Sequence, residues 1–284
     1  MKRASCVLVL CALAVLGCSS QNKDTAPAQS GAQPNVAEPA APAAQPPPAA
    51  AATQAATQAE PARAVIDTLM RGHFRQATEA REALIRGDMQ GAKQAMQWLT
   101  EHQETEAIPQ GFLPMYSAMQ ASAKKFGQAT TLREAGVALA ATLTKCADCH
   151  RSAQRGPKFG LPPLPAGTDG KSHMRRHLWV AQRMWEGLVD GSETTFPEAA
   201  KVLAAEHWNT DVLALKGNTN ETVAQNLDKY IHELSAEAPQ ATTPDARGEL
   251  YGHFLATCAT CHRLLGRGPA TPALQPAATQ PGAK

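Results

Sequence analysis

The sequence predicts an all-α protein built as a tandem duplication of a four-helix bundle. Apolar side chains recur at helical spacing over the central 200 or so residues, with no alternating strand pattern. Turn and capping residues divide each half into four helical segments. Residues 70–74 (MRGHF) are matched by residues 174–178 (MRRHL), which indicates an internal repeat. Short connections between consecutive helices favour antiparallel neighbours and therefore a bundle in each half.

The helix boundaries follow from a few local signals. Gly87 ends the first predicted helix and Asp88 caps the second. Pro114 suits the first turn of the third helix. Thr131-x-x-Glu134 is a capping box that opens the fourth. In the second half, the corresponding signals are Gly191, Pro197 and Thr243-Pro244.

Each fourth helix ends in the same motif. Cys146-x-x-Cys149-His150 in the first half is repeated as Cys258-x-x-Cys261-His262 in the second. C-x-x-C-H is the attachment sequence of c-type haem. Residues three and four apart share one face of a helix, so two thioether bonds and an iron-ligating imidazole fit one turn. The motifs therefore predict two covalently bound haem c groups, with His150 and His262 as proximal ligands.

The sixth iron ligand is left open by the sequence. An up-down bundle places the first predicted helix of each half opposite its haem motif. His73 and His177 are the favoured distal ligands, and Met70 and Met174 are the alternative; an iron without a sixth protein ligand is the third option. Several further residues are expected to bond the propionates or, equally, to serve only as helix C-terminal cations. These are His102, His207, Arg151, Arg155, Arg263 and Arg267.

The chain begins with features of an exported lipoprotein. A basic start and a short apolar run predict a signal peptide over residues 1–17, and Leu16-Gly17-Cys18 resembles a lipobox with Cys18 as the lipidated residue. Ser19 favours the outer membrane of a Gram-negative bacterium, with the protein in the periplasm. Apart from Cys6, Cys11 and Cys18, all the cysteines belong to the two haem motifs.

Composition suggests the remaining boundaries. Residues 18–62 and 271–284 are rich in small and polar residues and are predicted to be disordered. The bundles are predicted over 63–157 and 172–270, as separable domains joined by a Pro/Gly linker at 158–171. Loss of the signal peptide removes Lys2 and Arg3 from 27 basic residues, which leaves 25 against 25 acidic ones. Because the charge is balanced, we expect no nucleic-acid partner.

A bundle with C-x-x-C-H on its last helix, followed by basic residues, resembles the cytochrome c′ family. The resemblance covers most of residues 63–270. Asp67 and Lys171 depart from it, because the family has an apolar residue there that closes the distal site. With two similar haem sites, the resemblance implies a membrane-anchored electron carrier that serves a redox partner protein and is not an enzyme. The alternative is a gas-binding or sensing protein, or a haem enzyme, with an open iron position.

Overall fold

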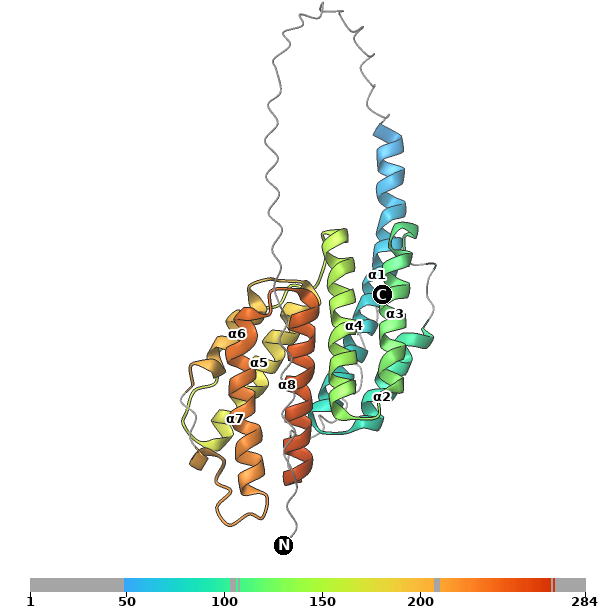
Figure 1. The fold of residues 1–284 in the computed structure, drawn as a ribbon. Coiled ribbons are helices and arrows are strands. Elements are labelled where there is room, and N and C mark those ends of the chain that lie inside the picture. Colours follow the sequence, from blue (N-terminus) through green and yellow to red (C-terminus); the bar gives the residue numbers. More distant parts are fainter. Residues whose placement is uncertain (1–48, 103–105, 107, 207–209, 267, 269–284) are drawn as a thin grey trace, which may run out of the picture. The chain divides into compact units, whose positions relative to one another are not determined.

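The computed structural model describes residues 49–102, 106, 108–206, 210–266 and 268. All regular secondary structure in this part of the chain is helical (Figure 1), which confirms the all-α prediction. The predicted signal peptide, Cys18, His207, Arg267 and the C-terminal tail lie outside the described residues. No helix within the described part is long and apolar enough to cross a membrane.

Within the described residues, the first half contains four α-helices. They are α1 (Ala49–Ile85), α2 (Met89–Glu101), α3 (Leu113–Gln128) and α4 (Leu132–Ala153), with the short η2 (Gln110–Phe112) before α3. Helix α1 begins at Ala49, within the segment predicted to be disordered up to residue 62. This segment is rich in alanine, which has the highest intrinsic helix propensity, and it continues directly into the amphipathic part of α1.

The second half follows the same order. Its helices are α5 (Gly170–Asp190), α6 (Thr195–Ala204), α7 (Glu221–Glu237) and α8 (Pro244–Leu265), with η3 (Thr210–Leu213) and η4 (Ala238–Gln240) flanking α7. The predicted boundary signals act as expected. Asp88 accepts a hydrogen bond from the Gly91 amide at 2.8 Å, and Gly191 ends α5 with a φ of 72°. These local signals are reliable because each satisfies backbone groups that a helix end leaves unpaired.

Helices α4 and α8 lie side by side and join the two halves (Figure 1). Their backbones approach closely at a pair of glycines. A Cβ atom on Gly136 would lie 2.3 Å from the carbonyl oxygen of Gly252, and one on Gly252 would lie 2.6 Å from the backbone of Val137. One buried core runs through helices of both halves. Each half therefore buries apolar surface against the other, and the independence of the two halves stays a prediction.

The predicted linker lies against α5. The indole nitrogen of Trp179 donates to the carbonyl oxygen of Pro162 at 3.1 Å. The ring of Phe159 lies 5.8 Å from that of Phe74 and 5.9 Å from that of Trp185, centroid to centroid. The segment from 158 to 169 has no regular structure, but these contacts fix it to both halves.

The capping box at the start of α4 leads to a first prediction. Thr131 accepts from the Glu134 amide at 3.1 Å, and the Glu134 carboxylate accepts from the amides of Thr130 and Thr131. Thr131→Ala is expected to lower the free energy of unfolding by about 1 kcal/mol in chemical denaturation. Thr68→Ala, on the exposed face of α1, is the control and should change it by less than about 0.5 kcal/mol. Equal losses in both variants would contradict a capping role.

The same box predicts a dependence on pH. Hydrogen bonds from Thr130 and then Thr131 lower the pKa of Glu134 below its ordinary value. A carboxyl group with a lowered folded-state pKa stabilises the protein above its unfolded pKa and loses that effect as the pH falls through the folded value. The stability difference between the wild type and Glu134→Gln should therefore shrink on acidification.

Candidate metal centre

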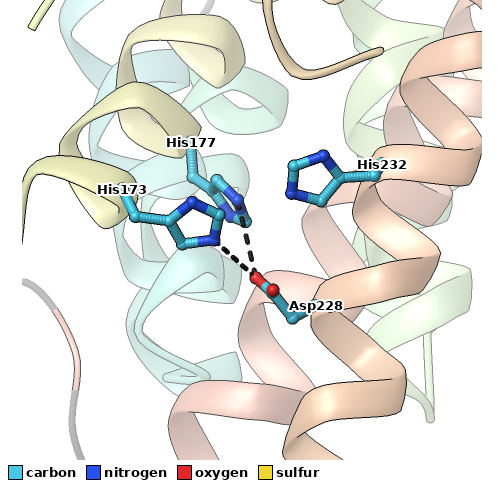
Figure 2. A group of neighbouring side chains, drawn as sticks. All are labelled: His173, His177, Asp228 and His232. Atoms are coloured by element: carbon cyan, nitrogen blue, oxygen red, sulfur yellow. Dashed lines mark hydrogen bonds and ion pairs between the residues drawn. The ribbon is translucent and has the colours of Figure 1, made fainter. Parts of the chain in front are cut away.

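Two residue pairs, each spaced by one helical turn, face each other in the second half. His173 and His177 lie on α5, and Asp228 and His232 lie on α7. Residues four apart share a helix face, so each helix presents two donor side chains to the other. All four side chains are buried, and one ligand atom from each lies within 4.8 Å of the others (Figure 2). We call these four residues the His/Asp cluster.

His173 is hydrogen-bonded through both ring nitrogens. Its Nε2 lies 2.9 Å from Oδ1 of Asp228, and its Nδ1 lies 3.1 Å from Oε1 of Glu206. Burial by itself would lower the pKa of His173, but the hydrogen bonds and negative charges of Asp228 and Glu206 outweigh burial and raise it. Arg176 bonds the same Glu206 oxygen, with its Nε at 3.0 Å. The carboxylates therefore hold the imidazole in a fixed orientation.

The other two imidazoles each have a nitrogen without a hydrogen-bond partner. The Nε2 atoms of His177 and His232 are buried and accept or donate no hydrogen bond within the described part of the chain. His232 directs its Nδ1 at the carbonyl oxygen of Leu203, 2.8 Å away, so its Nε2 carries the lone pair. Burial, followed by the charges of His173 and His232, keeps the pKa of His177 well below its ordinary value. Both nitrogens are thus placed to bind a metal ion.

The donor set limits the choice of metal. Imidazole suits zinc, copper, iron and nickel, whereas calcium and magnesium prefer sites made of oxygen ligands. With bonds of about 2.0–2.1 Å, the donors around such an ion lie within roughly 3–4 Å of one another. The cluster spans up to 4.8 Å, so binding requires the side chains to draw slightly closer. His173 would exchange its bond to Asp228 for a bond to the ion.

A cavity of about 710 Å³ adjoins the cluster and brings several of the predicted site residues together. His177 and Asp228 form part of its wall. The predicted haem-binding residues in the same wall are Met174, Cys258, Cys261 and His262. The cavity is completed from the first half by Ile85, the last residue of α1.

The cysteines of both motifs form no disulfide bond. Burial raises the pKa of Cys146 and of Cys258 to about 12, and that of Cys261 to about 11. Burial also raises the pKa of Cys149. A thiolate, and not a thiol, is the nucleophile and the metal ligand, so burial disfavours the reactive form of these groups.

The His/Asp cluster corrects the prediction of two covalently bound haem c groups. His177, which the sequence assigned to a haem iron, lies instead within a buried set of three imidazoles and one carboxylate. That set is suited to direct coordination of a metal ion and not to covalent haem c. The motif spacing places two cysteines and a histidine on one helical turn, but it carries no information about the residues that α5 and α7 bring beside that turn.

The first half has a different arrangement at the matching position. His73, which corresponds to His177, stacks on Tyr116 with ring centroids 5.7 Å apart and lies edge-on to Trp98 at 5.8 Å. Trp98 in turn stacks on His102 at 4.0 Å. Burial, and then the charge of His102, lowers the pKa of His73 to about 4. The two halves therefore differ at this point, although their sequences predict two similar sites.

The remaining predicted residues have other contacts. Arg151 forms an ion pair with Asp148 at 2.6 Å, and Arg263 packs against the turn at Gly87. The backbone amide of Arg155 donates to the carbonyl oxygen of His150 at 3.0 Å. Met70 is half-buried on α1. The three arginines all lie near the ends of α4 and α8.

Sequence reasoning missed three members of the cluster. These are His173, Asp228 and His232, and His232 has no counterpart in the first half. The spacing contained a usable signal, since His173-x-x-x-His177 and Asp228-x-x-x-His232 each place two metal ligands on one helix face. What the spacing does not reveal is that the two pairs meet, because 55 residues separate His173 from Asp228.

The fold and this site define a class: an all-helical protein with a buried His/Asp cluster that can hold a metal ion. No family model, no curated protein and no solved structure matches the chain.

Proposed function

We propose that this protein is an exported electron carrier that exchanges electrons with a partner protein through a redox-active metal ion in the His/Asp cluster. The observation that carries the proposal is the pair of buried Nε2 atoms, on His177 and His232, that lack a hydrogen bond within the described residues. A buried polar atom without a partner costs about 1–3 kcal/mol, and a metal ion would satisfy both nitrogens at once. Copper and iron are the ions that suit imidazole and also change oxidation state.

The burial of the site supports electron transfer over substrate chemistry. Four protein ligands can fill the coordination sphere of one ion, which leaves little to rearrange when the ion is oxidised or reduced. The carboxylate of Asp228 would partly neutralise the ion, and hydrogen bonding and burial would tune its potential.

The architecture in this proposal is that of two fused four-helix bundles. The topology resembles the cytochrome c′ family, and a C-x-x-C-H sequence closes the last helix of each bundle. We further propose that the signal peptide over residues 1–17 directs export and that a lipid on Cys18 anchors the protein, in the periplasm and at the outer membrane. These features rest on the sequence.

The cavity beside the cluster favours a second candidate function. Its wall includes His177 and Asp228, and its volume of about 710 Å³ leaves room for a small molecule next to the ion. If one of the four residues is not bound to the metal, a diatomic gas could take its position. The protein would then bind or sense a gas and would not act as a carrier.

Metal analysis combined with optical spectroscopy tests the proposal. The protein purified from the exported fraction is expected to contain one copper or iron ion per chain and to show reversible oxidation and reduction. Spectra unchanged by carbon monoxide or nitric oxide would support the carrier. A spectral shift with either gas would favour the gas-binding candidate instead.

Two outcomes would contradict the proposal. The first is a protein that contains neither copper nor iron after export. The second is haem that remains attached after denaturation, which would show thioether bonds at the C-x-x-C-H motifs. His253→Ala is a suitable control for metal content, because His253 lies on α8 outside the cluster.

A further inference from the structure

The histidine of each C-x-x-C-H motif is hydrogen-bonded to the opposite half of the protein. Nδ1 of His262, on α8, lies 2.6 Å from the carbonyl oxygen of Ile85 at the end of α1. Nδ1 of His150, on α4, lies 2.9 Å from the carbonyl oxygen of Val189 near the end of α5. Each half thus supplies a carbonyl oxygen to the motif histidine of the other half.

The acceptors occupy matching positions. Ile85 follows Met70 by the same number of residues as Val189 follows Met174, and these methionines belong to the repeated strings. Each acceptor stands two residues before a glycine in the left-handed region, Gly87 with a φ of 76° and Gly191 with a φ of 72°. Glycine adopts this conformation without the steric cost that a side chain would impose.

These glycine turns press against the helices that carry the histidines. A Cβ atom on Gly87 would lie 2.3 Å from Cγ of Arg263, next to His262. A Cβ atom on Gly191 would lie 2.5 Å from Nη1 of Arg151, next to His150. The turn therefore has to come this close for its preceding carbonyl group to reach the imidazole.

The chemistry of the contact decides the tautomer. A carbonyl oxygen only accepts hydrogen bonds, so Nδ1 of a neutral imidazole in this contact carries the proton. Nε2 is then left with its lone pair, which is the state required of a metal ligand. The hydrogen bond made by Nδ1 also fixes the orientation of the ring. For His262, the ring lies in the wall of the cavity that also contains His177.

We propose that the two halves position each other's motif histidines: the turn after α1 holds His262, and the turn after α5 holds His150, each with Nε2 available to a transition metal. Ile85 and Val189 are positioning residues that act through their backbone carbonyl groups. This reciprocal arrangement does not depend on a metal ion in the His/Asp cluster.

Nuclear magnetic resonance of the full chain, labelled with ¹⁵N-histidine and prepared without added metal, tests the proposal. In the wild type, the neutral rings of His150 and His262 should each show a protonated Nδ1 and an unprotonated Nε2. Their signals can be identified by their loss in His150→Gln and His262→Gln. A protonated Nε2 on either ring would overturn the assignment.

Three glycine variants test the reciprocity. Gly87→Ala should shift the ring nitrogens of His262 and leave those of His150 unchanged, whereas Gly191→Ala should do the reverse. Gly217→Ala is the matched control, because Gly217 also has a positive φ, of 80°, but its added Cβ would meet nothing within 4 Å. Shifts confined to the histidine of the mutated half, or equal shifts in all three variants, would refute reciprocal positioning. If an alanine variant does not fold, the wild-type tautomers still decide the matter.

Discussion

Replacing Asp228 by asparagine is expected to lower the affinity for copper or iron by at least about 10–100-fold, the range typical for loss of an outer-sphere partner of a metal ligand. Asp228 supplies the only carboxylate of the His/Asp cluster, and Oδ1 lies 2.9 Å from Nε2 of His173 and 3.6 Å from Nε2 of His177. Asparagine keeps the shape and an acceptor oxygen but removes the charge that attracts a cation. Isothermal titration of each ion into the metal-free protein measures the effect.

Two comparisons give this prediction its specificity. His232→Ala removes one neutral ligand and should also weaken binding, whereas His253→Ala, on α8 outside the cluster, should leave the affinity unchanged. Circular dichroism of each variant shows whether the helices are retained. If Asp228→Asn binds the ion as tightly as the wild type, the cluster is not the metal site.

Alanine at Gly136 is expected to destabilise the protein by about 1–3 kcal/mol, the usual cost of overpacking a close contact. The added Cβ atom would lie 2.3 Å from the carbonyl oxygen of Gly252, and this neighbour is helix backbone that cannot move aside as a side chain can. Helices α4 and α8 would have to separate. Thermal and chemical denaturation measure the loss, and a decrease in melting temperature of roughly 2–4 °C per kcal/mol is expected for a domain of 150–250 residues.

Gly127→Ala is the matched control for this change. Gly127 is also helical, in α3, but a Cβ atom added there would meet nothing within 4 Å. Because alanine is the better helix former, this variant should be more stable by about 0.5–1 kcal/mol. The opposite signs follow from one difference, the approach of the second helix. A gain in stability for Gly136→Ala would show that α4 and α8 do not pack as described.

The α4–α8 contact also bears on the expectation that the two halves are independent domains. The predicted linker at 158–171 was expected to separate two independent domains. The halves instead share one core, and the turns at Gly87 and Gly191 reach across to the opposite motif helices. Composition reveals a proline-rich connection, but it does not reveal whether the segments on either side pack together.

The sequence by itself determined the helices and most of their ends. The residues that end or cap the helices act over only a few positions, because each affects the unpaired backbone groups of its own helix end. They include Gly87, Asp88, Thr131 and Gly191. The sequence also determined that two cysteines and a histidine share one turn in each half. Such features depend on neighbours along the chain, which a pattern can represent.

Only the tertiary structure decided which side chains share a site. His173 and Asp228 are 55 residues apart, and their contact depends on how α5 and α7 face each other. The same holds for His262 and the carbonyl group of Ile85, which are 177 residues apart. The haem prediction followed the local motif, whereas distant residues form a cluster of four candidate metal ligands. Burial, which lowers the pKa of His177 and raises those of the thiols, is likewise a property of the packed helices and not of any single segment.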